Sequence, residues 1–217
     1  MKLFLSADIE GTAGIVHWDE TGLGKPLYEH FSRQMTREVA AACEGAQEAG
    51  AQSLLVKDAH GSARNIDPEM LPECVDIFRG WGRAPYCMMS GLTASFDGVL
   101  FTGYHSAAGT DANPLSHTMD LHIAEVRING EIASELYINC LIAALENVPV
   151  YFVSGDQGLC DWVKTKNPNI RTVAVSRGVG RGSVSIHPDK AVQRIRESVA
   201  EALTKPSEDF YFPMPNH

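Results

Sequence analysis

The amino-acid sequence predicts an α/β protein with a largely parallel sheet that is flanked by helices. Short apolar runs of strand length alternate with longer segments in which apolar residues recur at three- and four-residue steps. Strands that alternate with helices in this way form parallel sheets covered on both faces. Near residues 122–134, Asn129-Gly130 favours a tight turn between two short segments and predicts an inserted β-hairpin.

The composition limits the class of protein and its partners. The chain has 217 residues, of which 44% are hydrophobic and 21% charged, as expected for one globular domain. A net charge of −9 argues against binding to nucleic acid or to an anionic membrane surface. No apolar run approaches the ~20 residues of a membrane helix, and the first residues do not resemble a signal peptide. Five irregularly spaced cysteines without a CxxC pair indicate reduced thiols and a cytoplasmic protein.

The first half of the chain alternates strand runs with helical periodicity. Leu3-Phe4-Leu5 predicts a buried strand, and the helical pattern over 27–49 stops at Gly50, a usual residue just after a helix. The other elements predicted here are strands at 53–56, 75–78 and 98–102 and a short helix at 88–92.

The second half begins with a loop at 106–118 that is rich in Gly, Asp, Asn, Pro and Ser. After the hairpin we expect a helix at 134–146 with Ser134 as its N-cap. The glycine-rich segment 177–183 matches neither a P-loop nor a dinucleotide-binding spacing, so we expect a flexible loop whose arginines could lie at a subunit contact. The remaining predicted elements are strands at 150–153 and 172–175 and helices at 159–166 and 188–203.

Possible metal ligands follow the apolar runs. Asp8 and Glu10 follow the first run, and their alternate spacing places both carboxylates on one side of an extended chain. His60 follows the run at 53–56, and His105 follows the run at 98–102. The carboxyl ends of parallel strands meet at one edge of a sheet, so we expect these side chains to converge there.

Carboxylates and imidazoles without thiolates suit Zn²⁺, Mn²⁺ or similar divalent ions. A carboxylate such as Asp8 can bridge two metals about 3.5–4 Å apart, as in many hydrolases that activate water. Glu131 and Glu135 both lie near the junction of the hairpin and the helix, and either is a possible further ligand. Glu135 is also explained as a first-turn charge of the helix. Asp58 stays undecided, and Asp156 is better explained as the N-cap of the next helix.

His117 differs from the other candidate histidines because it lies on the predicted polar loop and follows no strand. A loop beside a metal centre can place an imidazole over a bound substrate, which makes His117 a candidate catalytic base or hydrogen-bond donor. The simpler alternative is a solvated loop residue. The remaining histidines lack comparable neighbours and are expected to be structural or solvated: His17, His30, His122, His187 and His217.

Five segments resemble, in the same order, the D-aminopeptidases of the DppA type, peptidase family M55. The segments are 6–15 (SADIEGTAGI), 56–61 (VKDAHG), 101–107 (FTGYHSA), 115–119 (LSHTM) and 134–139 (SELYIN). The resemblance implies an aminopeptidase with two Zn²⁺ per subunit, a small peptide substrate and assembly into a homo-oligomer, a decameric ring.

The resemblance also implies a role for each candidate residue. It pairs Glu10 with His60 at one metal and His105 with Glu135 at the other, and it makes His117 the catalytic residue. The implied metal ligands, of which the first bridges the two metals, are Asp8, Glu10, His60, His105 and Glu135.

The C-terminus departs from the family pattern, because members of this family continue beyond the point at which this chain ends. We expect a single α/β metallo-aminopeptidase domain at 1–205 and a Pro-rich tail at 206–217, with the family's further C-terminal segment absent. All the expected ligands precede the tail, so any effect of this departure falls on the oligomer and the substrate pocket.

The sequence thus predicts a zinc-dependent aminopeptidase that hydrolyses short peptides or amino-acid amides, with the D configuration at the N-terminal residue implied by the resemblance. Two alternatives stay open. One is another dinuclear metal amidohydrolase that acts on a different amide, and the other is a non-catalytic α/β protein that binds metal for structure or sensing. A catalytic site keeps a coordination position open for water, whereas a structural site is closed.

Overall fold

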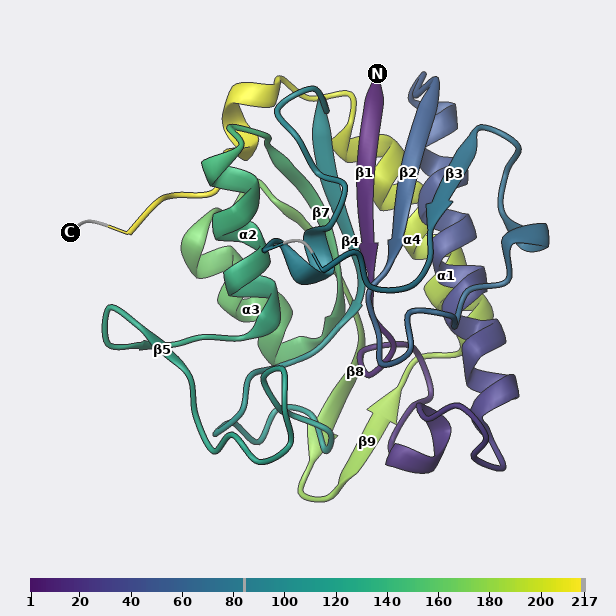
Figure 1. Ribbon diagram of the computed structural model, residues 1–217, viewed down its shortest axis with the longest axis vertical. Coiled ribbons are helices and arrows are strands. Elements are labelled where there is room, and N and C mark those ends of the chain that lie inside the picture. The colour runs from purple at the N-terminus through teal and green to yellow at the C-terminus, as the bar shows by residue number, and fades with distance from the viewer. Residues whose placement is uncertain (84, 216–217) are drawn as a thin grey trace.

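The computed structural model describes residues 1–83 and 85–215, which form a seven-stranded sheet with helices on both faces (Figure 1). The strands of this sheet are β1 (Lys2–Ala7), β2 (Ser53–Asp58), β3 (Val75–Phe78), β4 (Gly98–Tyr104), β7 (Val150–Asp156), β8 (Arg171–Val179) and β9 (Gly182–Ser185). Their spatial order is β3-β2-β1-β4-β7-β8-β9. All neighbours are parallel except β8 and β9, so the predicted largely parallel sheet is confirmed.

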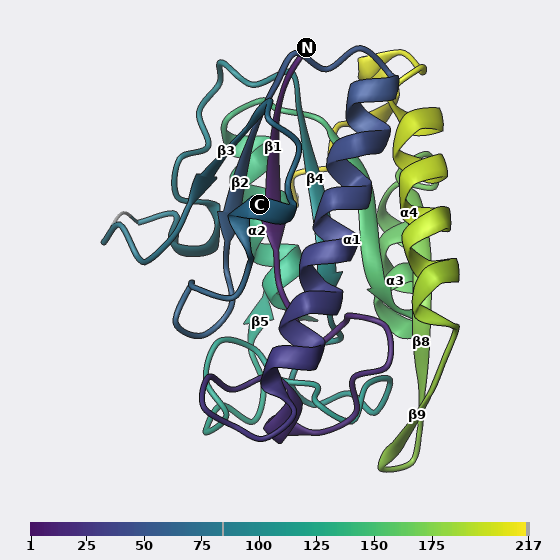
Figure 2. The same ribbon diagram turned by 90° about the vertical axis from the view of Figure 1, so that its right-hand side faces the viewer.

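In the described part of the chain, four α-helices cover the sheet. They are α1 (Tyr28–Glu48), α2 (Glu135–Leu145), α3 (Gln157–Lys166) and α4 (Pro188–Ala202). Figures 1 and 2 show α1 and α4 side by side on one face, with α2 and α3 on the other. Gly45 lets α1 and α4 approach closely, because a Cβ atom there would collide with the carbonyl group of Arg196. The predicted helices are confirmed, with small differences at their ends.

The core lies along the central strands. Leu3, Phe4 and Leu5 of β1 and Leu100 and Phe101 of β4 have no exposed surface. Because helices cover both faces, apolar residues follow one another directly in these stretches and do not alternate with polar residues. Complete burial of a Leu or Phe side chain contributes about 1.5–3 kcal/mol each, so these strands are firmly fixed. The segments that follow them therefore start from rigid positions.

β1 lies where the chain changes direction across the sheet. From β1 the chain adds β2 and β3 on one side, and then crosses to add β4 and β7 on the other. In sheets of this kind, ligands bind beyond the carboxyl ends of the strands at this switch point. The segments after β1 and β4 flank that position, below the arrowheads of the central strands in Figure 1.

The predicted hairpin is confirmed, although it is shorter than expected. β5 (Arg127–Ile128) and β6 (Glu131–Ile132) pair antiparallel, and Asn129 and Gly130 between them both have positive φ angles. Residues 123–126, which the sequence places in the first strand, are not part of it. The predicted short helix at 88–92 is the 3-10 turn η3 (Cys87–Met89), and the other 3-10 turns in the described residues are η1 (Trp18–Glu20), η2 (Pro68–Met70) and η4 (Ser207–Phe210).

The prediction of a flexible loop at 177–183 is wrong. β8 continues to Val179, and β9 begins at Gly182 and pairs antiparallel with it, joined by a turn at Gly180, whose φ angle is +59°. The density of glycine in this segment concealed its strand character. A β-hairpin requires glycine only at its turn, and the other glycines lie within its strands.

Two aromatic residues after residue 205 pack against the domain. Phe210, the last residue of η4, stacks on Tyr151 with ring centroids 4.5 Å apart, and Phe212 lies 6.0 Å from the rings of Tyr137 and Trp162. The domain boundary at residue 205 stays a prediction, and His217 lies outside the described residues. Among the helices that the structure describes, none has both the length and the apolar character required to cross a membrane.

Candidate metal centre

The loop after β1 directs Asp8 and Glu10 to one point at the edge of the sheet. The backbone N–H of Gly11 donates to the carbonyl group of Gly103 at 2.8 Å, which holds this loop against the end of β4. The two segments meet backbone to backbone, because a Cβ atom at Gly11 would collide with the carbonyl group of Tyr104. Both acidic side chains are consequently buried.

His60 and His105 approach Asp8 from two sides. His60 Nδ1 lies 3.3 Å from Asp8 Oδ1 and 3.1 Å from Glu10 Oε2. His105 Nε2 lies 3.4 Å from Asp8 Oδ2 and 3.3 Å from Glu135 Oε2. The structure therefore brings together all five residues that were predicted as ligands, with Asp8 in the middle.

Glu135 reaches this cluster from the start of α2, whereas Glu131 does not. Glu135 is the first residue of the helix, and its Oε1 accepts a hydrogen bond from the backbone N–H of Met119 at 2.7 Å. Glu131 instead accepts hydrogen bonds from Lys166 Nζ at 2.5 Å and Trp162 Nε1 at 2.9 Å. The spacing in the sequence could not distinguish the two glutamates, and these contacts do.

His117 lies against the cluster from the loop 106–118. Its ring stacks on that of His105 with centroids 4.3 Å apart and an interplanar angle of 5°, and it meets Trp18 edge-on at 5.3 Å. Its Nε2 lies 3.5 Å from Glu135 Oε1. With 13% of its side chain exposed, His117 is not a solvated loop residue.

The two imidazole rings of the cluster and the adjacent ring of His117 each have one nitrogen within hydrogen-bond distance of a backbone carbonyl group. The ring nitrogens are Nε2 of His60, Nδ1 of His105 and Nδ1 of His117. An N–H at that position donates to the carbonyl group and leaves a lone pair on the other nitrogen, which faces the carboxylates. Metal-binding histidines are usually held in this way. The accepting carbonyl groups are those of Thr21, Ser106 and Leu115, at 3.0, 2.9 and 3.0 Å respectively.

The cluster contains buried polar atoms that lack partners. Asp8 Oδ2, Glu10 Oε2 and His105 Nε2 are buried and form no hydrogen bond with any residue the structure describes. Buried polar groups are almost always paired, because each unpaired one costs about 1–3 kcal/mol. Ligand atoms of Asp8, Glu10 and His105 lie within 4.8 Å of one another, as do those of His105, His117 and Glu135. This donor set fits divalent metal ions.

The electrostatics of the cluster favour positive charge among its carboxylates. Burial alone would raise the pKa of Asp8, but the imidazoles of His105 and His60, in close contact with the carboxylate, outweigh this effect and hold that pKa well below its usual range. Burial alone would lower the pKa of His60 and His105, yet the carboxylates of Asp8, Glu10 and Glu135 raise it well above the usual value. The carboxylates thus draw protons onto the rings, and a divalent ion at this point would supply the same positive charge in place of those protons.

Asp156 and Asp58 position the loops that carry the cluster. Asp156 caps α3 by accepting the N–H of Leu159 at 2.9 Å, which confirms its predicted role as an N-cap. It also accepts the backbone N–H and the hydroxyl group of Ser106, both at 2.6 Å, and so fixes the residue after His105. Asp58 accepts two hydrogen bonds from Asn65, from its backbone at 2.5 Å and from its side chain at 2.7 Å.

The histidines that were predicted to be structural or solvated lie outside the cluster where they are described. His17 and His187 cap η1 and α4, and the exposed His122 pairs with Asp120. His30 lies on the exposed side of α1 and stacks edge-on against Phe31 at 4.9 Å. None of these rings belongs to the groups of ligand atoms found in the described residues.

The cluster forms the floor of a cleft with a volume of about 340 Å³. The cleft opens to solvent, so the floor can be reached by a small molecule. Apolar or polarisable side chains also line the cleft: Trp18, Trp81, Cys87, Met88, Met119 and Leu121.

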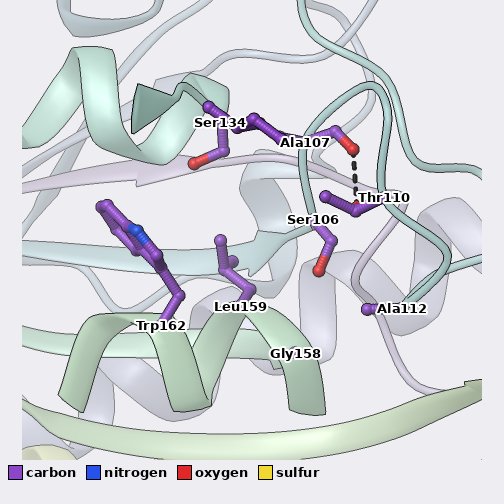
Figure 3. Close-up of a pocket in the computed structure, with 9 residues that line it drawn as sticks. Ser106, Ala107, Thr110, Ala112, Ser134, Gly158, Leu159 and Trp162 are labelled. Atoms are coloured by element: carbon purple, nitrogen blue, oxygen red, sulfur yellow. Dashed lines mark hydrogen bonds between the residues drawn. The ribbon is translucent and has the colours of Figure 1, made fainter. Parts of the chain in front are cut away.

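A second, smaller cavity of about 150 Å³ lies between α3 and the loop 106–118 (Figure 3). Trp162 and Leu159 project into it from the helix, and a hydrogen bond of 2.7 Å from the Thr110 hydroxyl group to the Ala107 carbonyl group closes the loop on the other side. Its lining contains no acidic, basic or histidine side chain among the described residues. Within the described part of the chain, this cavity therefore offers no acid, base or metal ligand for catalysis.

Comparison with known proteins agrees with this geometry. The sequence profile of the D-aminopeptidases, peptidase family M55, matches residues 1–216. The chain belongs to this family. It is 33% identical over 204 residues to a D-aminopeptidase of Bacillus subtilis (strain 168), and this alignment covers 94% of this chain and 74% of that protein. The resemblance predicted from the five sequence segments is confirmed.

The fold of this M55 chain is also that of a solved family structure. It superimposes with a TM-score of 0.88 on the structure described as the Zn-dependent D-aminopeptidase DppA from Bacillus subtilis, a self-compartmentalizing protease. The two sequences are 32% identical, and the match covers 98% of this chain and 77% of the other.

Proposed function

We propose that this M55 chain is a zinc-dependent aminopeptidase that hydrolyses short peptides or amino-acid amides with a D-residue at the N-terminus. The observation that carries the proposal is the set of buried atoms on Asp8, Glu10 and His105 that form no hydrogen bond with any described residue. These atoms lie within 4.8 Å of one another, and the first two of these residues line an open cleft. Membership of the family supports the reaction, and the similar protein described as Zn-dependent supports the metal.

Two Zn²⁺ per subunit are the proposed cofactors. Glu10 and His60 would hold one ion, His105 and Glu135 the other, and Asp8 would bridge them, which its central place between the two imidazoles supports. When bound, the ions would polarise the scissile carbonyl group and lower the pKa of an attacking water. The open cleft supports a catalytic site, because it lets water and a small substrate reach the cluster, as the open coordination position of a catalytic zinc site requires.

His117 is the proposed catalytic residue. The Leu115 carbonyl group can hold its Nδ1–H and leave Nε2 free beside Glu135, on the lining of the cleft. In this state Nε2 can accept a proton from the attacking water and later donate it to the leaving amine. The stacked ring of His105 and the edge of Trp18 restrict the rotation of the His117 ring and keep Nε2 in the cleft.

A homo-oligomer, specifically a decameric ring, is the proposed assembly, and the description of the similar DppA as self-compartmentalizing supports it. Light scattering that reports a monomer at micromolar concentration would contradict it. The cytoplasm is the proposed compartment, and the five cysteines, all of them free, support a reducing environment.

Metal analysis of the purified protein, combined with a screen of D- and L-aminoacyl amides, tests the function. We expect two divalent ions per chain, hydrolysis of D-aminoacyl amides, and loss of both ions in Asp8→Ala because this carboxylate contacts both imidazoles. Asp76→Ala, which removes an exposed carboxylate from β3, is the matched control. Full metal content in Asp8→Ala would remove Asp8 from the site, and inactivity towards every amide would refute the proposed reaction.

A further inference from the structure

Trp81 lies on the cleft above the cluster, and the proposed chemistry does not use it. Its indole ring lines the same cleft as Glu10 and His60, and 43% of the residue is exposed to solvent. Leaving so large an apolar surface in water is unfavourable, since exposed apolar area costs about 25 cal/mol per Å². An exposed tryptophan in a cleft therefore has the character of a binding surface.

Trp81 is also held in a fixed position. Its Nε1–H donates to the carbonyl group of Gly61 at 2.8 Å, and Gly61 directly follows His60. The Nζ of Lys57 lies 4.4 Å from the centre of the Trp81 ring and donates to the carbonyl group of Gly80, the preceding residue, at 2.7 Å. Ring and backbone are thus both anchored, whereas a solvated surface side chain would have no such partners.

Lys57 makes the arrangement unusual, because lysine is almost never fully buried. This residue has no exposed surface, and besides Gly80 it donates only to the carbonyl group of Asp58, at 2.7 Å, among the described residues. The rest of its ammonium group faces the rings of Phe78 and Trp81. A buried ammonium against two aromatic faces is a cation–π arrangement, which is stronger when desolvated and orients the rings.

The other end of the cleft is apolar as well. Met119 and Leu121 line it, with 43% and 62% of their surface exposed, and the backbone of Met119 contacts Glu135. Trp81 is joined to the His60 end of the cluster, so apolar walls stand on both sides of the metal-binding groups. A peptide bound across the cluster would place a side chain against one of these walls.

We propose that Trp81 is a specificity-determining residue that contacts a bulky apolar or aromatic side chain of the substrate, next to the scissile bond, and that Lys57 is a positioning residue for Trp81. The inference rests on the proposed aminopeptidase function and adds the substrate class. The cleft, with a volume of about 340 Å³, has room for a side chain of this size beside the reacting amide.

The test compares the hydrolysis of D-phenylalaninamide and D-alaninamide by the metal-loaded protein. In Trp81→Ala, kcat/KM for D-phenylalaninamide should fall about tenfold, chiefly through KM, because apolar contacts of this size discriminate by about 10–200-fold. The value for D-alaninamide should change less than twofold. Trp81→Phe, which keeps an aromatic face, should recover most of the loss. Leu145→Ala, an exposed residue at the end of α2 that does not line the cleft, is the control.

The positioning role of Lys57 needs a separate readout. The contribution of Trp81 to the near-ultraviolet circular dichroism is the difference between the spectra of the wild-type and Trp81→Phe proteins. In Lys57→Met this contribution should weaken. The selectivity for D-phenylalaninamide over D-alaninamide should also fall, as it does in Trp81→Ala. A lower unfolding midpoint with unchanged Trp81 dichroism would show that Lys57 is only structural. If Lys57→Met does not fold, the proposal for Trp81 is decided by the Trp81 variants alone.

The outcomes separate this inference from the proposed function. If the wild-type protein hydrolyses both amides and Trp81→Ala affects both equally or neither, the inference is wrong and the function stands. If no amide is hydrolysed, the function fails, and titration of the protein with D-phenylalaninamide, followed by tryptophan fluorescence, decides the contact. Fluorescence quenching that is present in the wild-type protein and disappears in Trp81→Phe would support the contact. If the wild-type protein shows no quenching, the contact is overturned. A smaller assembly of Trp81→Ala in light scattering would assign Trp81 to a subunit interface and also overturn it.

Discussion

Replacing Glu38 with glutamine is expected to stabilise the protein at neutral and alkaline pH. Glu38 lies on α1 and is fully buried, and its Oε1 accepts hydrogen bonds from the backbone N–H of Ala13 and from Gln34 Nε2, both at 3.0 Å. Its Oε2 has no hydrogen-bond partner in the described part of the chain. Glutamine has the same shape and keeps an oxygen for both donors, so the substitution chiefly removes the buried charge.

The magnitude follows from the pKa of Glu38. Burial raises this pKa from the ordinary value of 4.5 to about 7, and the hydrogen bonds from Gln34 and Ala13 only partly oppose the rise. The folded protein therefore binds a proton more tightly than the unfolded chain, and stability falls as the pH rises from 4.5 through 7. At about 1.36 kcal/mol per pKa unit, the full loss is about 3 kcal/mol, of which about 2.5 kcal/mol occurs between pH 5 and pH 8.

Urea unfolding of the wild-type and Glu38→Gln proteins at pH 5, 6, 7 and 8 measures this effect, at one fixed protein concentration. The difference in the free energy of unfolding between the variant and the wild-type protein should grow in favour of the variant by about 2.5 kcal/mol from pH 5 to pH 8, because glutamine has no proton to lose. Glu29→Gln, an exposed residue in the first turn of the same helix, is the matched control and should show a constant difference. If the difference in the free energy of unfolding between Glu38→Gln and the wild-type protein also stays constant with pH, the reasoning is refuted. Such a result would mean that water reaches this carboxylate.

Two further substitutions test the cluster and its support. His117→Ala should keep its metal and its fold but lose about 10²–10⁴-fold in turnover, as expected for a proton-transfer residue, and loss of one metal equivalent would instead make His117 a ligand. Asp156→Ala should lower the free energy of unfolding by about 2–4 kcal/mol, measured in urea, because it leaves the buried donors of Ser106 and Leu159 without an acceptor. An unchanged unfolding midpoint would show that these donors find other partners.

The convergence of the candidate ligands could be predicted from the sequence, since it follows from strand order alone. Asp8, His60 and His105 each follow an apolar run, and parallel strands deliver the residues after their carboxyl ends to one edge. No detailed contact is needed for that argument. The roles of the ligands and of His117, and the number of metal ions, stay predictions.

The contacts that orient the cluster could not be predicted in the same way. Glu135 was distinguished from Glu131 only by the family resemblance, because the deciding partners, Met119 and Lys166, are set by tertiary packing. Similarly, Asp156 was correctly predicted as a helix cap, but its bonds to Ser106 depend on where a remote loop lies. The wrong prediction of a loop at 177–183 had a local cause. The glycines of this segment are typical of loops, but here they lie in a pair of antiparallel strands and their turn.

The backbone hydrogen bonds that hold the rings of the cluster have a consequence for metal capture. The rings of His60 and His105 are within reach of fixed carbonyl groups, and the backbone of Met119 holds Glu135, so these side chains have little rotamer freedom left to lose. Ordering a long side chain costs up to about 2 kcal/mol, and here folding has already ordered them. The metal-free protein should therefore keep its fold. A rigid site of oxygen and nitrogen donors also fixes the coordination geometry in advance, so that this geometry, together with metal supply, would decide which divalent ion is bound.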